Sequence, residues 1–309
     1  MTKPPPSNSE IPTAKHGKRA VRKNKYGYYE IVNKPTHQEL QDYYEHEYHK
    51  IRVDGLRTTN IAPIDKDYIN INLELKYSVI NELHKKRKES KLLDVGCGEG
   101  WCLSYFNERG WDVTGLDLSD FGCQIHHPHL LSRLISGDIS TSIKSLHDTE
   151  RTFDLIFLDN VLEHVISPEE LINDCRQLAH QETVLLIEVP NDYSPVQNHL
   201  MKESKISEDN FVVYPDHLSY FNAAGLSKLL EACGWKTVFT MSDFPIDLFL
   251  FNETTNYYHN PSIGRTVHEA RVEIVKLLHS ISITKSIDLY RSFAELGLGR
   301  QLISYYQLI

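Results

Sequence analysis

The sequence predicts an α/β fold in which a mostly parallel β-sheet is covered by helices on both faces. Apolar runs of strand length alternate with helix-length amphipathic segments between residues 92 and 243. Two of these runs, at the start of 153–165 and within 183–191, are almost continuously apolar, which is typical of strands buried on both faces. This alternation indicates a doubly wound sheet with its ligand site at the carboxyl ends of the strands.

The chain before this core divides into three parts. Residues 1–25 carry seven lysine and arginine residues and one glutamate, and we expect them to form a disordered basic tail. Residues 26–64 form a separate N-terminal segment with a predicted helix at 36–49. Residues 65–89 have the apolar periodicity of an amphipathic helix, and we place the start of the main domain there.

Residues 92–118 contain the most specific pattern, LLDVGCGEGWCLSYFNERGWDVTGLDL. A strand leads into a turn with Gly96, Gly98 and Gly100, and a helix then leads to a second strand that ends at Asp117. Glycine has no Cβ, so a ligand can approach the backbone closely, and the helix directs free N–H groups toward the same place. A carboxylate at the next strand end can accept hydrogen bonds from both hydroxyls of a ribose. The pattern therefore predicts a site for an adenosine-containing cofactor.

The spacing of the glycines narrows the choice of cofactor. The dinucleotide fingerprint needs a third small residue where this chain has Trp101, and no G-K-[ST] follows any glycine run. The stretch instead resembles the first two motifs of class I S-adenosylmethionine-dependent methyltransferases, which read V/L-D-V/I-G-C-G-x-G. The resemblance implies a Rossmann-like, seven-stranded, mostly parallel sheet and S-adenosyl-L-methionine as the cofactor.

The resemblance also implies roles for individual residues. The three glycines would cradle the methionine half of the cofactor, Asp117 would hold the ribose, and Asp138 would lie near the adenine. The segment 153–165 resembles the fourth motif of the same family. The residues expected to bind the cofactor are Asp94, Gly96, Cys97, Gly98, Gly100, Asp117, Leu118, Asp138, Ile139 and Asn160.

The chain after residue 190 contains an insertion and an extension. Residues 190–221 are too long for a simple connection, and they follow a strand end, so we expect them to build the pocket for the methyl acceptor. A capped helix at 222–234 and a strand at 235–243 follow, and the predicted methyltransferase domain ends at residue 260. Residues 261–309 have apolar residues at helical spacing and predict a helical C-terminal extension. Two roles stay open for it, a cover over the active site or the surface of a homodimer.

Two histidines are candidates for the base that removes a proton from the acceptor, because histidine has an unperturbed pKa near 6.5. His217 lies in the insertion beside Asp216, which can select its tautomer, and His164 follows the fourth strand. Structural roles are the alternative for both histidines. Tyr220 is expected to line the acceptor pocket. No paired histidine and carboxylate spacing occurs on one element, so we predict no metal site. The other histidines, including His126, His127 and His129, are expected at the surface.

Further resemblances concern the acceptor. The segments 35–48, P-D-H-L-S-Y-F and 244–265 resemble methyltransferases found with bacterial surface-polysaccharide enzymes. This resemblance implies a lid that carries Tyr44 and Tyr48 and, as acceptor, a sugar hydroxyl in polysaccharide biosynthesis. The form D-N-V-L-E-H resembles the ubiquinone-pathway methyltransferases, so a phenolic or quinone-like acceptor is the alternative. Carbon methylation of a nucleotide sugar and a non-catalytic partner protein with this fold also stay open.

Composition excludes some classes of function. The net charge of −9 disfavours nucleic acid as the main partner, because duplex binding depends on neutralising phosphates. The sequence contains no run of about 18 apolar residues, so we predict no membrane span. The start, MTKPPPSNSE, lacks the apolar core of a secretory signal. Five cysteines without a C-x-x-C pair predict reduced thiols, as in a cytoplasmic protein.

Overall fold

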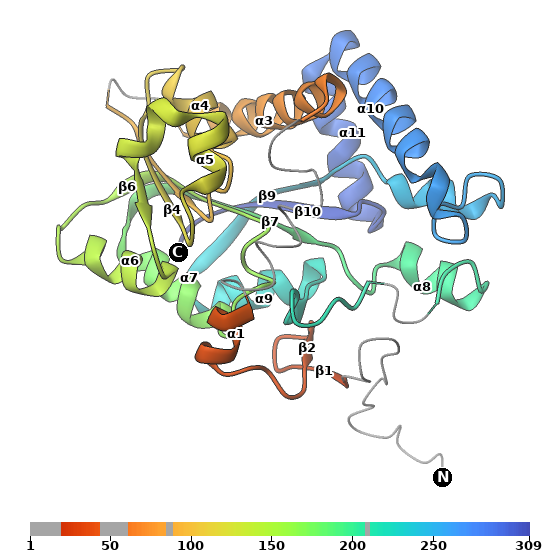
Figure 1. Cartoon of the computed structure of the whole chain (residues 1–309), viewed down its shortest axis with the longest axis horizontal. Helices are drawn as coiled ribbons and strands as arrows, with labels where there is room; N and C mark the ends of the chain where they lie inside the picture. Colours follow the sequence, from red (N-terminus) through yellow and green to blue (C-terminus); the bar gives the residue numbers. More distant parts are fainter. Residues whose placement is uncertain (1–19, 44–60, 85–88, 208–210) are drawn as a thin grey trace.

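The computed structural model describes residues 20–43, 61–84, 89–207 and 211–309. Its centre is a seven-stranded sheet with the order β5-β4-β3-β6-β7-β10-β9 (Figure 1). The strands are β3 (Lys91–Val95), β4 (Asp112–Asp117), β5 (Leu134–Ser136), β6 (Phe153–Asp159), β7 (Ala179–Pro190), β9 (Trp235–Ser242) and β10 (Gln301–Leu308). The first five run parallel, and β10 is antiparallel to both β7 and β9. This sheet confirms the predicted fold class.

Helices cover both faces of the sheet and bury a separate apolar core on each (Figure 1). One face packs against α6 (Ile139–His147), α7 (Pro168–Gln177) and α9 (Ala223–Ala232). The other face packs against α3 (Pro63–Leu83), α4 (Trp101–Asn107), α5 (Phe121–His126) and α11 (Ile283–Leu296). Because both faces are covered, every side chain of β6 from Phe153 to Leu158 is buried, as its apolar run predicts.

Local signals position several helices where the sequence predicts them. Ser167 caps α7 by accepting a hydrogen bond from the backbone N–H of Glu170, and Asn222 caps α9 through the N–H of Gly225. Gly234 follows α9 with a φ of 83°, the left-handed conformation that favours glycine at a helix end. The long helix predicted at 65–89 is α3, which ends at Leu83.

The C-terminal residues correct the predicted helical extension. Helices α10 (Gly264–Ile281) and α11 confirm its first part. The last residues instead form β10, which lies inside the main sheet between β7 and β9. Alternate side chains of this strand enter the two cores, Leu302 and Tyr306 on one face and Ile303 and Tyr305 on the other. A domain boundary at residue 260 would therefore separate this strand from its own sheet.

The N-terminal segment is joined to the insertion by a second, small sheet. Strand β2 (Tyr29–Ile31) pairs antiparallel with β1 (Val21–Lys23) and with β8 (Ser219–Tyr220). The side chain of Val21 is completely buried, so the basic tail ends before residue 25. Helix α1 (His37–Tyr43) is the described part of the helix predicted at 36–49. Tyr44 and Tyr48 lie outside the described residues.

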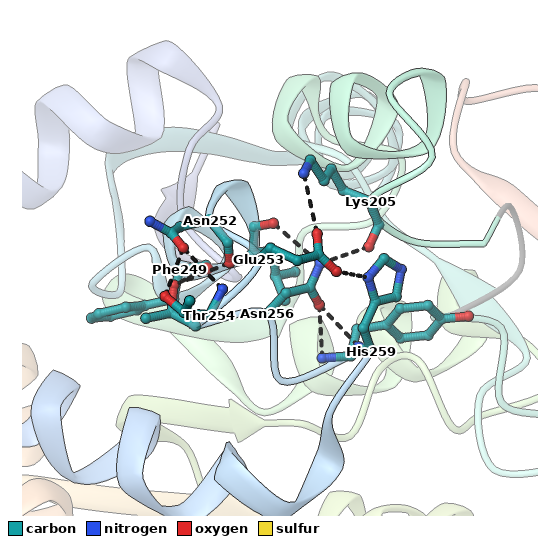
Figure 2. Close-up of polar contacts among 10 residues, drawn as sticks. Lys205, Phe249, Asn252, Glu253, Thr254, Asn256 and His259 are labelled. Carbon is teal, nitrogen blue, oxygen red and sulfur yellow. Dashed lines mark hydrogen bonds and ion pairs between the residues drawn. The ribbon is translucent and has the colours of Figure 1, made fainter.

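A polar network fastens the segment after β9 to the insertion (Figure 2). The buried Asn256 donates from Nδ2 to the carbonyl oxygens of Lys205 (3.0 Å) and Leu250 (3.2 Å). The ring of His259 is paired with Glu253 at 2.8 Å. Lys205 closely follows helix α8 (Pro195–Lys202), so the network links α8 to the 3₁₀ helices Ile246–Phe251 and Pro261–Ile263 that precede α10. Among the described helices, none is both long and apolar enough to cross a membrane.

A buried ion cluster connects α3 to the carboxyl ends of the central strands. The Lys76 ammonium lies 2.7 Å from Oδ2 of Asp159, at the end of β6, and 2.5 Å from Oε2 of Glu188 on β7. The Lys76 side chain is only 5% exposed. The two carboxylates keep Lys76 charged, because their attraction outweighs burial and raises the pKa of Lys76.

Replacing Lys76 with methionine should lower the free energy of unfolding by about 3–5 kcal/mol, because the buried Glu188 and the partly exposed Asp159 lose their counter-ion. Chemical denaturation followed by circular dichroism measures this loss. The double variant Lys76→Met/Glu188→Gln should recover part of it, since a single carboxylate then lacks a partner. The control Lys66→Met, at an exposed position of α3, should change stability by less than about 1 kcal/mol. Equal losses in the two Lys76 variants would contradict this account.

Candidate active site

The glycine turn between β3 and α4 is fastened to the end of β4. The backbone N–H groups of Gly96 and Cys97 donate to the carbonyl oxygen of Leu116, at 2.7 and 3.0 Å. The N–H of Gly98 donates to Oδ2 of Asp117 at 2.8 Å. The turn and the acidic strand end, which the sequence analysis assigns to one site, therefore contact each other directly.

Two of the glycines have different surroundings. All three turn glycines have positive φ. A Cβ on Gly96 would lie 2.4 Å from Cγ2 of Val161, so this position has no room for a side chain. A Cβ on Gly98 would meet no atom within 4 Å, so its backbone faces open space that a ligand can occupy.

Acidic groups surround this turn. Asp94, two residues before Gly96, is 2% exposed, and its Oδ2 has no hydrogen-bond partner among the described residues. Burial, together with the nearby Asp159, raises the pKa of Asp94 to about 8. Asp117 also accepts a hydrogen bond on Oδ1 from the N–H of Ser119 (3.1 Å). The open backbone and the unpartnered carboxyl oxygen fit a polar ligand with hydrogen-bond donors, such as the predicted cofactor.

The remaining predicted cofactor residues lie at the same edge of the sheet, because β3 to β6 run parallel. Leu118 is 41% exposed just after β4. Asp138 caps α6, with Oδ1 accepting from the N–H and the hydroxyl of Thr141, both at 2.8 Å. Ile139 is the first residue of that helix. Asn160 follows β6 with a φ of 54°.

The two predicted catalytic histidines meet, although one follows β6 and the other lies in the insertion. Their ring centroids are 4.8 Å apart, with the planes nearly perpendicular. Nδ1 of His164 lies 2.7 Å from the backbone oxygen of Asp216 and 3.2 Å from its Oδ1. A buried neighbour, Glu163, accepts hydrogen bonds on its backbone oxygen from the N–H groups of Leu218 and Ser219. The backbone thus holds the two segments together.

Glu163 is a site residue that the sequence analysis missed. Its side chain is 1% exposed, and neither carboxyl oxygen has a hydrogen-bond partner among the described residues. Oε1 lies 3.8 Å from Nε2 of His164. Burial raises the pKa of Glu163 to about 7. The only signal in the sequence is its position, directly before His164 and after a buried strand.

The environments of the two histidines favour different protonation states. Burial lowers the pKa of His217, and the neighbouring His164 lowers it further, so His217 is neutral near pH 7. Burial also disfavours the charge on His164, but hydrogen bonding to Asp216 and the charge of Glu163 outweigh burial and raise its pKa. Nδ1 of His217 is buried and has no hydrogen-bond partner among the described residues.

An aromatic cluster lies next to the histidines and joins the insertion to the small sheet. The rings of Tyr29 and Tyr193 are 4.0 Å apart, and Tyr193 lies 4.7 Å from Phe211. Tyr220 belongs to the same cluster. Its ring is fully buried and its hydroxyl donates to the backbone oxygen of His217 at 2.9 Å, so it positions that histidine rather than facing open space.

One of the histidines expected at the surface is buried. His127 is 8% exposed, and its Nδ1 lies 2.7 Å from the backbone oxygen of Glu99, within the glycine turn. The ring of Trp101 packs against it with the centroids 4.6 Å apart. His127 therefore packs against the glycine turn and stabilises it. The histidine-rich sequence around it gives no signal for this role.

Comparison with known proteins identifies the class of the chain. A family model described as a methyltransferase domain matches residues 71–239, which is more than half of the chain. The ubiquinone biosynthesis O-methyltransferase of Azoarcus sp. (strain BH72) is 33% identical over 91 residues, covering 29% of this chain and 39% of that protein. The mitochondrial enzyme of the same name from Saccharomyces cerevisiae is 32% identical over 120 residues, covering 38% of each chain. The match thus spans less than half the length of these relatives.

Solved structures agree on the fold. The plantazolicin methyltransferase BamL, solved with S-adenosylhomocysteine, has a TM-score of 0.52 and 13% identity, covering 87% of this chain and 94% of that one. The 1,6-didemethyltoxoflavin-N1-methyltransferase of Burkholderia thailandensis has a TM-score of 0.50 and 14% identity, covering 96% and 98%. Identities this low show the fold alone.

These findings support the predicted family and fold but not the predicted sugar acceptor. They confirm the predicted methyltransferase family and its α/β fold. They do not support the association with sugars and polysaccharide biosynthesis, since the curated relatives are named for ubiquinone biosynthesis. The match over residues 71–239 shows that the chain belongs to the methyltransferase-domain family, and its sheet has the predicted Rossmann-like fold.

Proposed function

We propose that this enzyme methylates a hydroxyl oxygen of a phenolic or quinone-like small molecule. The observation that carries the proposal is the aromatic cluster next to His217, in which Phe211 and Tyr220 are buried while the rings of Tyr29 and Tyr193 stay partly exposed. Aromatic side chains favour an aromatic acceptor through stacked and edge-to-face contacts. The names of the curated relatives support the same class of acceptor. A phenolic or quinone-like acceptor, the alternative that the sequence leaves open, is therefore favoured over a sugar hydroxyl.

We assign the methyl donor to the glycine turn. Gly96, Gly98 and Gly100 would lie against its methionine half, and the carboxylate of Asp117 would accept the ribose hydroxyls. Asp138 would lie near the adenine. When bound, S-adenosylmethionine supplies a methyl group on a positively charged sulfur. The buried Asp94 would accept a hydrogen bond from this ligand through its Oδ2, which is unpartnered among the described residues.

We assign the acceptor's hydroxyl to the cluster of Glu163, His164 and His217. The hydroxyl must lose its proton as the new carbon–oxygen bond forms, and a positioned base contributes ~10²–10⁴ in rate. His217 is half-buried, its Nδ1 is buried without a hydrogen-bond partner among the described residues, and its backbone oxygen is held by the Tyr220 hydroxyl. We therefore keep His217 as the proton acceptor. The lid role of Tyr44 and Tyr48 and the homodimer stay predictions.

Replacing Asp117 with asparagine should weaken binding of S-adenosylhomocysteine roughly 10- to 150-fold, because a hydrogen bond to a charged group is worth about 1.5–3 kcal/mol. Isothermal titration calorimetry measures the affinity. Asp120→Asn is the matched control, because this exposed side chain lies three residues further on. Unchanged affinity in Asp117→Asn would refute the ribose assignment.

Replacing His217 with alanine should reduce turnover of a catechol-type acceptor by ~10²–10⁴ while leaving the affinity for S-adenosylhomocysteine unchanged. Transfer of a radiolabelled methyl group to a panel of catechols, hydroxyquinols and nucleotide sugars measures both rate and acceptor class. His199→Ala, at an exposed position of α8, should retain full activity. Methylation of the sugars in preference to the phenols would overturn the proposed function.

A further inference from the structure

We propose that Glu163, His164 and His217 together bind one divalent transition-metal cation, such as Zn²⁺. Each of these residues offers one ligand atom, and the three atoms lie within 4.8 Å of one another. The set contains two imidazoles and one carboxylate, which is a typical ligand set of catalytic zinc sites. The metal-binding part of this proposal stands alone, whereas its use in catalysis rests on the proposed function.

The distances are close to those of a tetrahedral site. Nitrogen and oxygen ligands lie ~2.0–2.2 Å from zinc, so two tetrahedral ligands are about 3.3–3.6 Å apart. Oε1 of Glu163 and Nε2 of His164 are 3.8 Å apart, so this edge needs to shorten by only a few tenths of an ångström. The third ligand atom, on His217, lies within 4.8 Å of the other two, so its ring must move closer to complete the site.

The partner of His164 is typical of a metal ligand. Histidines that bind metals usually use their second ring nitrogen to donate a hydrogen bond to a backbone carbonyl or a carboxylate. Nδ1 of His164 lies 2.7 Å from the backbone oxygen of Asp216, which can only accept, so Nδ1 carries the proton. Nε2 of a neutral His164 ring then presents its lone pair toward Glu163.

A second observation supports the metal site independently of the distances: polar groups of the cluster are buried without hydrogen-bond partners among the described residues. Both carboxyl oxygens of Glu163 and Nδ1 of His217 are buried without hydrogen-bond partners in the described part of the chain. A buried polar group without a partner costs ~1–3 kcal/mol, and more when it is charged. A cation would bind these groups at the same time. The side chains of His164 and His217 are 19% and 18% exposed, which leaves a path for a cation to enter.

A cation here would give the acceptor's hydroxyl a fourth coordination position. Coordination lowers the pKa of a bound hydroxyl, so the O–H bond breaks and the proton passes to solvent water. The oxygen's electron pair then forms the bond to the methyl carbon, and the carbon–sulfur pair returns to sulfur. In this state His217 is a ligand and not the base. The His217→Ala variant loses turnover in either role, so metal binding is the measurement that separates them.

The test uses the purified full chain after treatment with a chelator. Titration calorimetry with ZnCl₂ and the visible spectrum of the Co²⁺ form report binding without any assay of turnover. We expect one equivalent to bind and a tetrahedral Co²⁺ spectrum with histidine ligands. Glu163→Gln and His217→Gln should weaken Zn²⁺ binding by at least about 10- to 100-fold, the loss typical of even outer-shell partners. His199→Gln, outside the cluster, should bind Zn²⁺ like the parent protein.

Binding of S-adenosylhomocysteine by every variant provides the control for folding. If all four proteins bind Zn²⁺ equally, or if none binds it, the metal site is refuted. If the parent binds Zn²⁺ but methylates no phenol, the metal site stands and the proposed acceptor fails. If the chelated protein methylates catechols at the full rate, a catalytic use of the cation is excluded and His217 acts as the base.

Discussion

The contact of one buried ammonium with two carboxylates is the constraint on which the arrangement of the site depends. Lys76 reaches from α3 to the ends of β6 and β7 and neutralises charges that the interior could not otherwise hold. Asp159, one of its partners, directly precedes the loop that carries Glu163 and His164. Because the ion cluster fixes where β6 ends, it also fixes where the histidine loop begins. Asp94, beside the same cluster, adds a further acid near the glycine turn.

The elements predicted from the sequence are those whose signals are local. The glycine turn, the buried run of β6 and the helix caps at Ser167 and Asn222 each depend on residues within one short segment. β10 was missed because a short apolar run fits a helix or a strand equally well, and its partners lie far away in the sequence. The run L-I-S-Y-Y alternates between two cores that exist only after the sheet has formed.

The same distinction explains which parts of the site could be predicted. His164 and His217 were recognised singly, from their positions after a strand and in the insertion. Their meeting depends on the hydrogen bonds of Leu218 and Ser219 with Glu163, which no spacing in the sequence reveals. Residue spacing along a single helix or strand does not reveal this cluster, because its members come from two segments of the chain.

The acceptor illustrates why composition alone misleads. The insertion reads as polar, and this favours a sugar, but it also buries aromatic rings, including Phe211 and Tyr220. Some of its polar residues are buried, Asn191 and Gln197 among them, and others join networks such as that of Lys205 with Glu253 (Figure 2). The side chains that can contact a ligand are selected by the fold, which composition does not reveal. The unpartnered Glu163 follows the same logic, because a buried acid that weakens the fold by itself is explained most simply by a ligand that it binds.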